Sequence, residues 1–205
     1  LIRTKYPILH DTALVIADPL VRNRATVGGN LAHADPANDH PATILALGAE
    51  VTATGARGQG TIALDRFFTG IFSTALAPDE ILTEIRIPIP PPKSGGAYVK
   101  LERKVGDFAT AAAAAQVTLG AGDEIERACI GLTAAGPTPI KATEAERFLV
   151  KKKPDAATIA EAAKLAAGAT APTVDRRGSV QYKKEMARVL TARALAKAIE
   201  RAGGR

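Results

Sequence analysis

The chain has 205 residues, of which 46% are hydrophobic and 23% charged, and its formal net charge is +6. This composition is typical of a folded protein and excludes a globally disordered chain. The single cysteine, Cys129, excludes an internal disulfide framework and excludes this chain as the sole holder of a thiolate-bound cluster. Because Cys129 lies in an apolar run, we expect its thiol to be buried and inert. A single cysteine fits a reducing compartment, so the protein is expected in the cytoplasm, either free there or peripheral at the inner face of the membrane.

The first 25 residues are expected to form irregular chain and a short strand. Arg22 and Arg24 stand at the end of this segment. They are interpreted either as added positive potential for a diphosphate or as a solvated basic turn. The spacing of the residues does not separate these two alternatives.

The next stretch, residues 25–41, concentrates backbone freedom and short polar side chains. Gly28 and Gly29 can adopt positive φ and leave no Cβ in the way of a ligand, so their N–H groups are candidates for an anion-binding nest. The spacing alone favours another interpretation, a hairpin turn followed by a helix cap. The candidate polar partners of a ligand are Thr26, Asn30 and Asp39.

Residues 43–47 are expected to form the apolar face of a helix that ends at Gly48. Residues 49–54 and 61–64 alternate as two strands around a glycine-rich loop, which predicts a β-hairpin, and a further strand is expected at 81–87. The large side chains of this region are expected in the core; they are Phe67, Phe68, Ile71 and Phe72.

Four prolines and two glycines within residues 88–96 predict a linker between two domains. Beyond it, three antiparallel strands are expected, at 98–104, 109–119 and 125–135. The run of alanines in the second of these conflicts with this prediction, since propensity alone favours a helix.

The remainder of the chain is expected to be helical. Thr143 and Glu146 are predicted to form a capping box at the start of a helix over 143–150. Asp155 is predicted to cap a helix over 156–167, and a last helix is expected over 180–202. Its apolar residues fall on two sides, which indicates a helix that is bent or lies between two surfaces.

The basic charge is concentrated in this helical region, because residues 141–205 hold 15 Lys and Arg against 7 Asp and Glu. Nucleic-acid binding is one interpretation. However, the charges are spaced along Ala-rich helices without aromatic side chains to stack on bases. A solvated helical face, or a surface that docks an acidic partner subunit, is therefore favoured.

A metal site is not expected, although four potential ligands lie within eight residues. Their spacing matches neither H-x-H-x-D-H nor H-E-x-x-H, and two prolines interrupt any single helix that would present them together. A G-x-S-x-G nucleophile motif and a G-x-G-x-x-G fingerprint are both missing from the sequence. The four potential ligands are His33, Asp35, Asp39 and His40.

The string T-V-G-G-N-L-A-H-A-D-P-A-N-D, which begins at Thr26, resembles the second flavin-binding motif of the FAD-carrying medium subunits of molybdenum hydroxylases, the carbon monoxide dehydrogenase and xanthine dehydrogenase family. The similarity continues downstream. The family's first motif, A-G-G-x-S, has no counterpart in this sequence, which starts at Leu1. We therefore expect the later part of a longer subunit, which binds FAD weakly or not at all when taken alone. The downstream segments are 67–70, 76–82, 85–88 and 98–109.

The resemblance implies an α+β fold. It comprises part of a PCMH-type FAD-binding domain, of which only the second lobe is present, in residues 1–90. A C-terminal domain of the flavoprotein subunit follows in residues 91–205, with an antiparallel three-stranded sheet and a C-terminal helical bundle.

The resemblance also implies the residues that bind FAD. Residues on the diphosphate and sugar side of the cofactor are Thr26, Gly28, Gly29, Asn30 and Asp39. Residues nearer the flavin ring are Leu76, Ile81, Lys100, Asp107 and Phe108, where Lys100 and Asp107 match charged positions and Phe108 matches a position that is often Tyr.

The implied function is electron transfer, with no catalytic residue and no metal ligand in this chain. FAD is expected to be bound non-covalently, and the molybdenum cofactor and 2Fe-2S clusters are expected only in partner subunits. The resemblance implies a dimer of heterotrimers with large molybdenum, medium flavin and small iron–sulfur subunits, which passes electrons to a quinone, NAD or oxygen. The alternatives are a flavin-free assembly or interaction subunit of such a complex and a basic nucleic-acid-binding protein.

Overall fold

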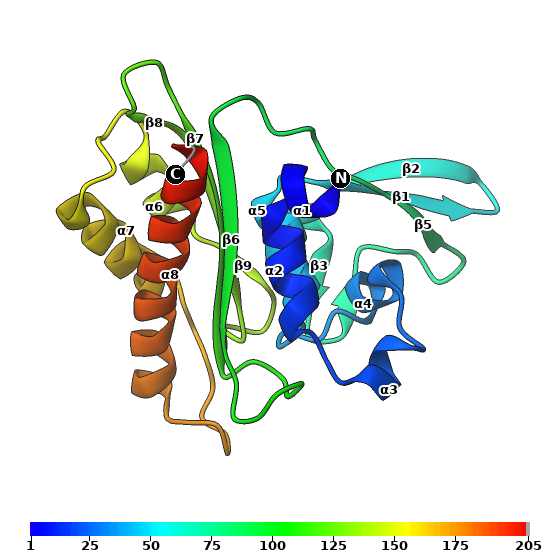
Figure 1. Ribbon diagram of the computed structural model, residues 1–205. Helices are drawn as coiled ribbons and strands as arrows, with labels where there is room; N and C mark the ends of the chain where they lie inside the picture. The colour runs from blue at the N-terminus through cyan, green and yellow to red at the C-terminus, as the bar shows by residue number, and fades with distance from the viewer. Residues whose placement is uncertain (204–205) are drawn as a thin grey trace.

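The computed structural model describes residues 1–203 and contains two groups of elements that lie side by side (Figure 1). The helices are α1 (Ile2–Lys5), α2 (Pro7–Val15), α3 (Pro19–Arg22), α4 (Val27–His33), α5 (Asp39–Ala46), α6 (Thr143–Leu149), α7 (Ala156–Gly168) and α8 (Val180–Ala202), with a 3-10 turn, η1, at Leu64–Arg66. The strands are β1 (Glu50–Gly55), β2 (Gly58–Ala63), β3 (Phe68–Gly70), β4 (Ser73–Thr74), β5 (Ile81–Arg86), β6 (Ser94–Leu101), β7 (Ala111–Leu119), β8 (Ile125–Thr133) and β9 (Ile140–Lys141).

The N-terminal segment is helical, so the prediction of irregular chain with a short strand is wrong. Pro7 and Pro19 each occupy the first turn of a helix, where a proline loses no hydrogen bond. Asp18 caps α3, because its side chain accepts a hydrogen bond from the N–H of Val21. The Asp18-Pro19 pair was therefore the sequence signal for this helix start.

The glycine pair lies inside α4 and does not form a nest. Thr26 is the N-cap of this helix and accepts a hydrogen bond from the N–H of Gly29 at 2.9 Å. Gly28 and Gly29 follow the helical backbone, and neither has a positive φ. The hairpin turn of the alternative interpretation is also wrong, whereas its helix cap is present. Local capping by Thr26 decided the conformation.

The hairpin and the later strand form a three-stranded sheet in the order β2-β1-β5, as expected. Phe67 is fully buried in the core beside this sheet. Ile71 and Phe72, in contrast, are 57% and 58% exposed, so their assignment to the core is wrong. Both lie at the turn between β3 and β4, which carries them away from the apolar layer.

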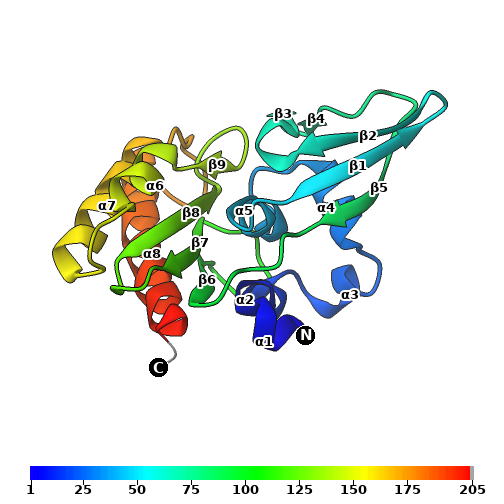
Figure 2. The same ribbon diagram turned by 90° about the horizontal axis from the view of Figure 1, so that it is seen from above.

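The second sheet has the three expected strands, and the short β9 adds a fourth in the antiparallel order β6-β7-β8-β9. β6 begins at Ser94, so the end of the expected linker belongs to this sheet. Figure 2 shows the sheet between α8 on one side and α2 and α5 on the other. The α+β prediction is confirmed, with helices on both faces of the sheet.

Burial on both faces explains why the alanine run of β7 is a strand. Ala113 and Ala115 pack in the core with α8, whereas Ala112 and Ala114 pack in the core with α2 and α5. Small side chains allow helices to approach the sheet closely. A Cβ on Gly131 would overlap the carbonyl oxygen of Ala42 in α5. Tertiary packing thus overrides the helical propensity of alanine.

The C-terminal helices agree with the sequence in position but only partly in capping. Asp155 caps α7 through the N–H of Thr158, as predicted. The predicted capping box at Thr143 is wrong, because Thr143 is already within α6. Its expected partner, Glu146, accepts instead from the N–H of Ile130 at 2.8 Å. α8 lies between the sheet and α7, which agrees with the two-sided pattern of its apolar residues.

Candidate functional site

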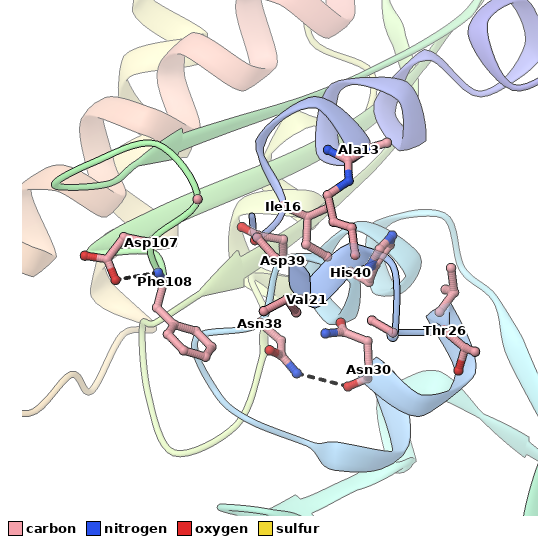
Figure 3. Close-up of a pocket in the computed structure, with 15 residues that line it drawn as sticks. Ala13, Ile16, Val21, Thr26, Asn30, Asn38, Asp39, His40, Asp107 and Phe108 are labelled. Atoms are coloured by element: carbon pink, nitrogen blue, oxygen red, sulfur yellow. Dashed lines mark hydrogen bonds between the residues drawn. The ribbon is translucent and has the colours of Figure 1, made fainter. Parts of the chain in front are cut away.

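A pocket of about 350 Å³ lies between the N-terminal helices and the loop that follows β6 (Figure 3). Its wall includes the ends of α2 and α3, the start of α4 and the start of α5. On the opposite side, Asp107 and Phe108 come from the connection between β6 and β7. The pocket therefore joins residues from both halves of the sequence.

Five of the ten sequence-predicted site residues line this pocket, and five do not. Gly28 and Gly29 lie in α4, and Leu76 packs against the core that contains Phe67, beside the β2-β1-β5 sheet. Ile81 is 71% exposed at the start of β5, while Lys100 is buried behind the pocket wall. The five that line the pocket are Thr26, Asn30, Asp39, Asp107 and Phe108.

Asp39 is held by two side chains of β6. Its Oδ1 accepts a hydrogen bond from the hydroxyl of Tyr98, and its Oδ2 lies 3.0 Å from Lys100 Nζ. Burial raises the pKa of Asp39, and the Lys100 charge opposes this increase. Burial and the neighbouring carboxylate also raise the pKa of Tyr98 well above its usual value, so this phenol is a neutral donor.

The family resemblance implies that Lys100 lies beside the flavin ring, and in the structure its ammonium is paired with Asp39. Its ammonium also donates to the carbonyl oxygen of Val15 at 3.0 Å and pairs with Glu102 at 3.2 Å. Tyr98 was not singled out as a site residue. No local sequence signal identifies it, because the contact with Asp39 spans 59 positions.

Two buried polar atoms near the pocket, Oδ1 of Asn30 and Nδ1 of His40, have no hydrogen-bond partner within the described residues 1–203. Both residues line the pocket, as does Arg22. Burial, with a contribution from the Arg22 charge, lowers the pKa of His40 to about 4. The imidazole is therefore neutral at pH 7. An unsatisfied buried polar atom is costly in a folded protein, so such atoms indicate where a ligand can bind.

The sequence marks His40 only as a potential metal ligand. Among residues 1–203, no group of three or more His, Cys, Asp or Glu side chains is placed to hold a metal ion. Asp35 bonds instead to the N–H of Ala37, and the His33 ring lies 5.1 Å from the Phe72 ring. Cys129 is a buried free thiol, as predicted.

Asp107 organises the mouth of the pocket. It accepts hydrogen bonds from the N–H of Phe108 at 2.8 Å, from Arg103 at 3.1 Å and from Arg177 at 2.9 Å. The hydrogen bond from Arg177, together with those from Arg103 and the Phe108 N–H, lowers the pKa of Asp107 to about 2. Phe108 is 46% exposed beside it.

Comparison with known proteins matches each half of the chain to a family model. Residues 1–90 match the model of the FAD binding domain in molybdopterin dehydrogenase. Residues 96–198 match the model of the CO dehydrogenase flavoprotein C-terminal domain. The chain belongs to this flavoprotein family.

Relatives of known name include two carbon monoxide dehydrogenase medium chains. The protein of Afipia carboxidovorans is 45% identical over 198 residues, which cover 97% of this chain and 68% of the relative. That of Hydrogenophaga pseudoflava is 38% identical, with 95% and 68% covered. The 6-hydroxypseudooxynicotine dehydrogenase complex subunit alpha of Paenarthrobacter nicotinovorans is 39% identical, with 96% and 66% covered.

Solved structures of this flavoprotein family have the same fold. A Cu,Mo-CO dehydrogenase chain superposes with a TM-score of 0.93 at 44% identity, covering 98% of this chain and 70% of that one. The predicted family, oxidoreductase class and FAD-binding character are thereby confirmed. The chain spans about two thirds of the length of these relatives. Within residues 1–203, no helix combines the length and apolarity needed to cross a membrane.

Proposed function

We propose that this chain is the flavoprotein subunit of a carbon monoxide dehydrogenase-like molybdenum hydroxylase, and that FAD binds non-covalently in the pocket shown in Figure 3. The observation that carries the proposal is the pair of unpartnered atoms, Asn30 Oδ1 and His40 Nδ1, in a pocket that Arg22 also lines. Ligand hydroxyl groups can donate to Asn30 Oδ1 and form a hydrogen bond with His40 Nδ1, and the Arg22 guanidinium suits a diphosphate.

The residues divide between two ends of the cofactor. We assign Thr26, Asn30 and Asp39 to its diphosphate and sugar side, together with the backbone of Gly28 and Gly29 at the start of α4. Asp107 and Phe108 lie across the pocket from Thr26 and belong to the ring side (Figure 3). Lys100 acts through Asp39. Leu76 and Ile81 are assigned to the ring side by family resemblance alone.

Bound FAD supplies the redox chemistry, and this chain positions it. Tyr98 and Lys100 each donate to one oxygen of Asp39 and so fix the orientation of its carboxylate. Each oxygen retains a second lone pair, which can accept from a sugar hydroxyl. Phe108 presents an aromatic face at the pocket mouth, where it excludes water from one side of a planar ligand. No acid or base of this chain is assigned to substrate oxidation.

The proposed complex has three subunit types, two copies of each. A large subunit would hold the molybdenum at which substrate is oxidised, and a small subunit would hold the iron–sulfur clusters that supply electrons to FAD in this chain. A quinone, NAD or oxygen is the final acceptor. Within this subunit, we propose residues 1–90 as the FAD-binding domain and 91–205 as the C-terminal domain.

FAD release and one charge variant test this function. The full-length subunit is purified in its complex, and FAD is expected in the soluble fraction after acid treatment. Asn30→Asp keeps the oxygen acceptor but adds a negative charge beside the proposed diphosphate, and the resulting repulsion is expected to weaken FAD affinity by about 10- to 100-fold. Gln59→Glu makes the same chemical change on the exposed β2 hairpin and serves as the matched control.

Three outcomes contradict the proposal. A complex that assembles without flavin would instead support a flavin-free assembly subunit. Flavin that stays attached to the denatured polypeptide would exclude non-covalent binding. Nucleic-acid affinity that falls steeply with salt would support the basic-protein alternative.

A further inference from the structure

The loop between β6 and β7, residues 102–110, is here called the rim loop. The N–H of Thr110 donates to the carbonyl of Leu101 at 2.8 Å, which closes the base of the loop. At its tip, Gly106 has a φ of +82°, and a Cβ there would lie 3.1 Å from the carbonyl carbon of Ala17. The rim loop therefore rests on the α2–α3 connection on its N-terminal side.

On its other side, the rim loop contacts Arg177 from the connection between α7 and α8. Arg177 Nη2 lies 2.9 Å from Asp107 Oδ1, and the Arg177 guanidinium carbon lies 5.9 Å from the centre of the Phe108 ring. The side chains of Asp107 and Arg177 are 9% and 25% exposed. Such a partly buried contact is screened less by water than an exposed ion pair.

Arg177 is itself held in place. Its backbone N–H donates to Asp175 Oδ1 at 2.8 Å, and Asp175 forms an ion pair with Lys183 of α8 at 2.8 Å. Lys183 is only 5% exposed and also donates to the carbonyl of Thr173 at 2.9 Å. A continuous set of polar contacts thus runs from α8 to the pocket mouth.

We propose that Arg177 is a positioning residue for the flavin site: it fixes Asp107 and the adjoining Phe108 ring, and so sets how closely the flavin ring is covered. This inference rests on the function proposed above. Arg177 does not line the pocket, so it acts through the rim loop. The C-terminal helices thereby determine the exposure of a cofactor held mainly by the N-terminal half.

The test uses the full-length subunit in its complex and three variants. Arg177→Gln removes the ion pair, and Arg177→Lys keeps the charge but loses the planar donor. Arg176→Gln is the matched control, because Arg176 is the exposed neighbour and makes the same charge change. None of these substitutions alters a residue that lines the pocket.

Two measurements distinguish positioning from a purely structural contact. Amide hydrogen exchange of residues 102–110 is expected to become about 10- to 100-fold faster in Arg177→Gln, on the scale of a charge-assisted hydrogen bond. The rate constant for iodide quenching of bound-flavin fluorescence is expected to rise at least about twofold, because a mobile Phe108 exposes the ring. Arg177→Lys should lie between these values and wild type, and Arg176→Gln should match wild type.

Each remaining result overturns the inference. Unchanged exchange and quenching in Arg177→Gln would show that Arg177 does not hold the rim loop. Faster exchange with unchanged quenching would limit Arg177 to a structural role. A complex that binds no flavin would remove the proposed function and this inference with it, while the exchange measurement would still report whether the Arg177 contact exists.

Discussion

The pocket has two carboxylates with different surroundings, one at its floor and one at its rim. At the floor, Asp39 pairs with Lys100, which does not itself line the pocket, and the two side chains are 5% and 1% exposed. At the rim, Asp107 is paired with Arg177 and Arg103, whose side chains are 25% and 54% exposed. Similar ion pairs therefore serve different purposes: the floor pair is part of the folded core, whereas the rim pairs hold a surface loop.

The largest expected effect is at the floor. Lys100→Met leaves the Asp39 carboxylate buried without its cation, and removing one partner of a buried pair costs about 3–5 kcal/mol. Urea denaturation of the full-length subunit measures this free energy. Lys104→Met removes an exposed lysine four residues away and is the control. If Lys100→Met lowers the free energy of unfolding no more than Lys104→Met does, the floor pair is as weak as a surface pair.

A smaller loss is expected when the other floor contact is removed. Tyr98→Phe deletes the hydroxyl that donates to Asp39 and leaves a buried acceptor with one donor fewer, which costs about 1–3 kcal/mol. Tyr182→Phe makes the same change at a residue that is 44% exposed. If both variants unfold at the same urea concentration, the phenol does not support the carboxylate.

His40, which also lines the pocket, predicts a pH dependence of the fold's stability. The folded imidazole has a pKa of about 4 against 6.5 when unfolded. As the pH falls, the unfolded chain therefore binds a proton first, and lowering the pH from 7 to 5.5 destabilises the fold by about 1.2 kcal/mol through this group. His40→Gln should remove this part of the pH dependence, while His33→Gln, at an exposed position, should retain it.

The smallest effect is expected at the outer part of the rim. Arg103 is more than half exposed and shares Asp107 with Arg177, so Arg103→Gln should leave the denaturation midpoint within experimental error. The same variant should leave the exchange of the rim loop slower than Arg177→Gln does. Equal exchange rates would show that the two arginines contribute alike and would weaken the role assigned to Arg177.

Local patterns predicted the elements whose conformation is decided locally. The β1–β2 hairpin, β5, the Asp155 cap and the extent of α8 all follow from strand alternation or capping residues near in sequence. Local patterns alone did not predict the strand at residues 111–115, because the propensity of alanine favours a helix. The strand is explained by the helices that pack on both of its faces. The strand was predicted from the family resemblance together with the strand-forming residues that follow, Val117, Thr118 and Leu119.

The site was less accessible to sequence reasoning because its contacts are distant along the chain. Asp39 meets Tyr98 and Lys100 about sixty positions away, and Asp107 meets Arg177 across 70 positions. The glycine pair suggested an anion-binding nest, but Thr26 caps a helix that contains both glycines. The family resemblance placed Thr26, Asp39 and Asp107 around one cofactor, but it did not predict which atoms hydrogen-bond to one another.

The two-sided burial of β7 makes this strand a partition between the two halves of the subunit. A larger residue at Ala112 or Ala114 would press on α2 and α5, which contribute to the pocket wall, whereas one at Ala113 or Ala115 would press on α8. Neighbouring positions on one strand therefore affect opposite compartments. Enlarging Ala112 or Ala114 is therefore expected to lower flavin affinity, whereas enlarging Ala113 or Ala115 is expected to disturb the packing of α8.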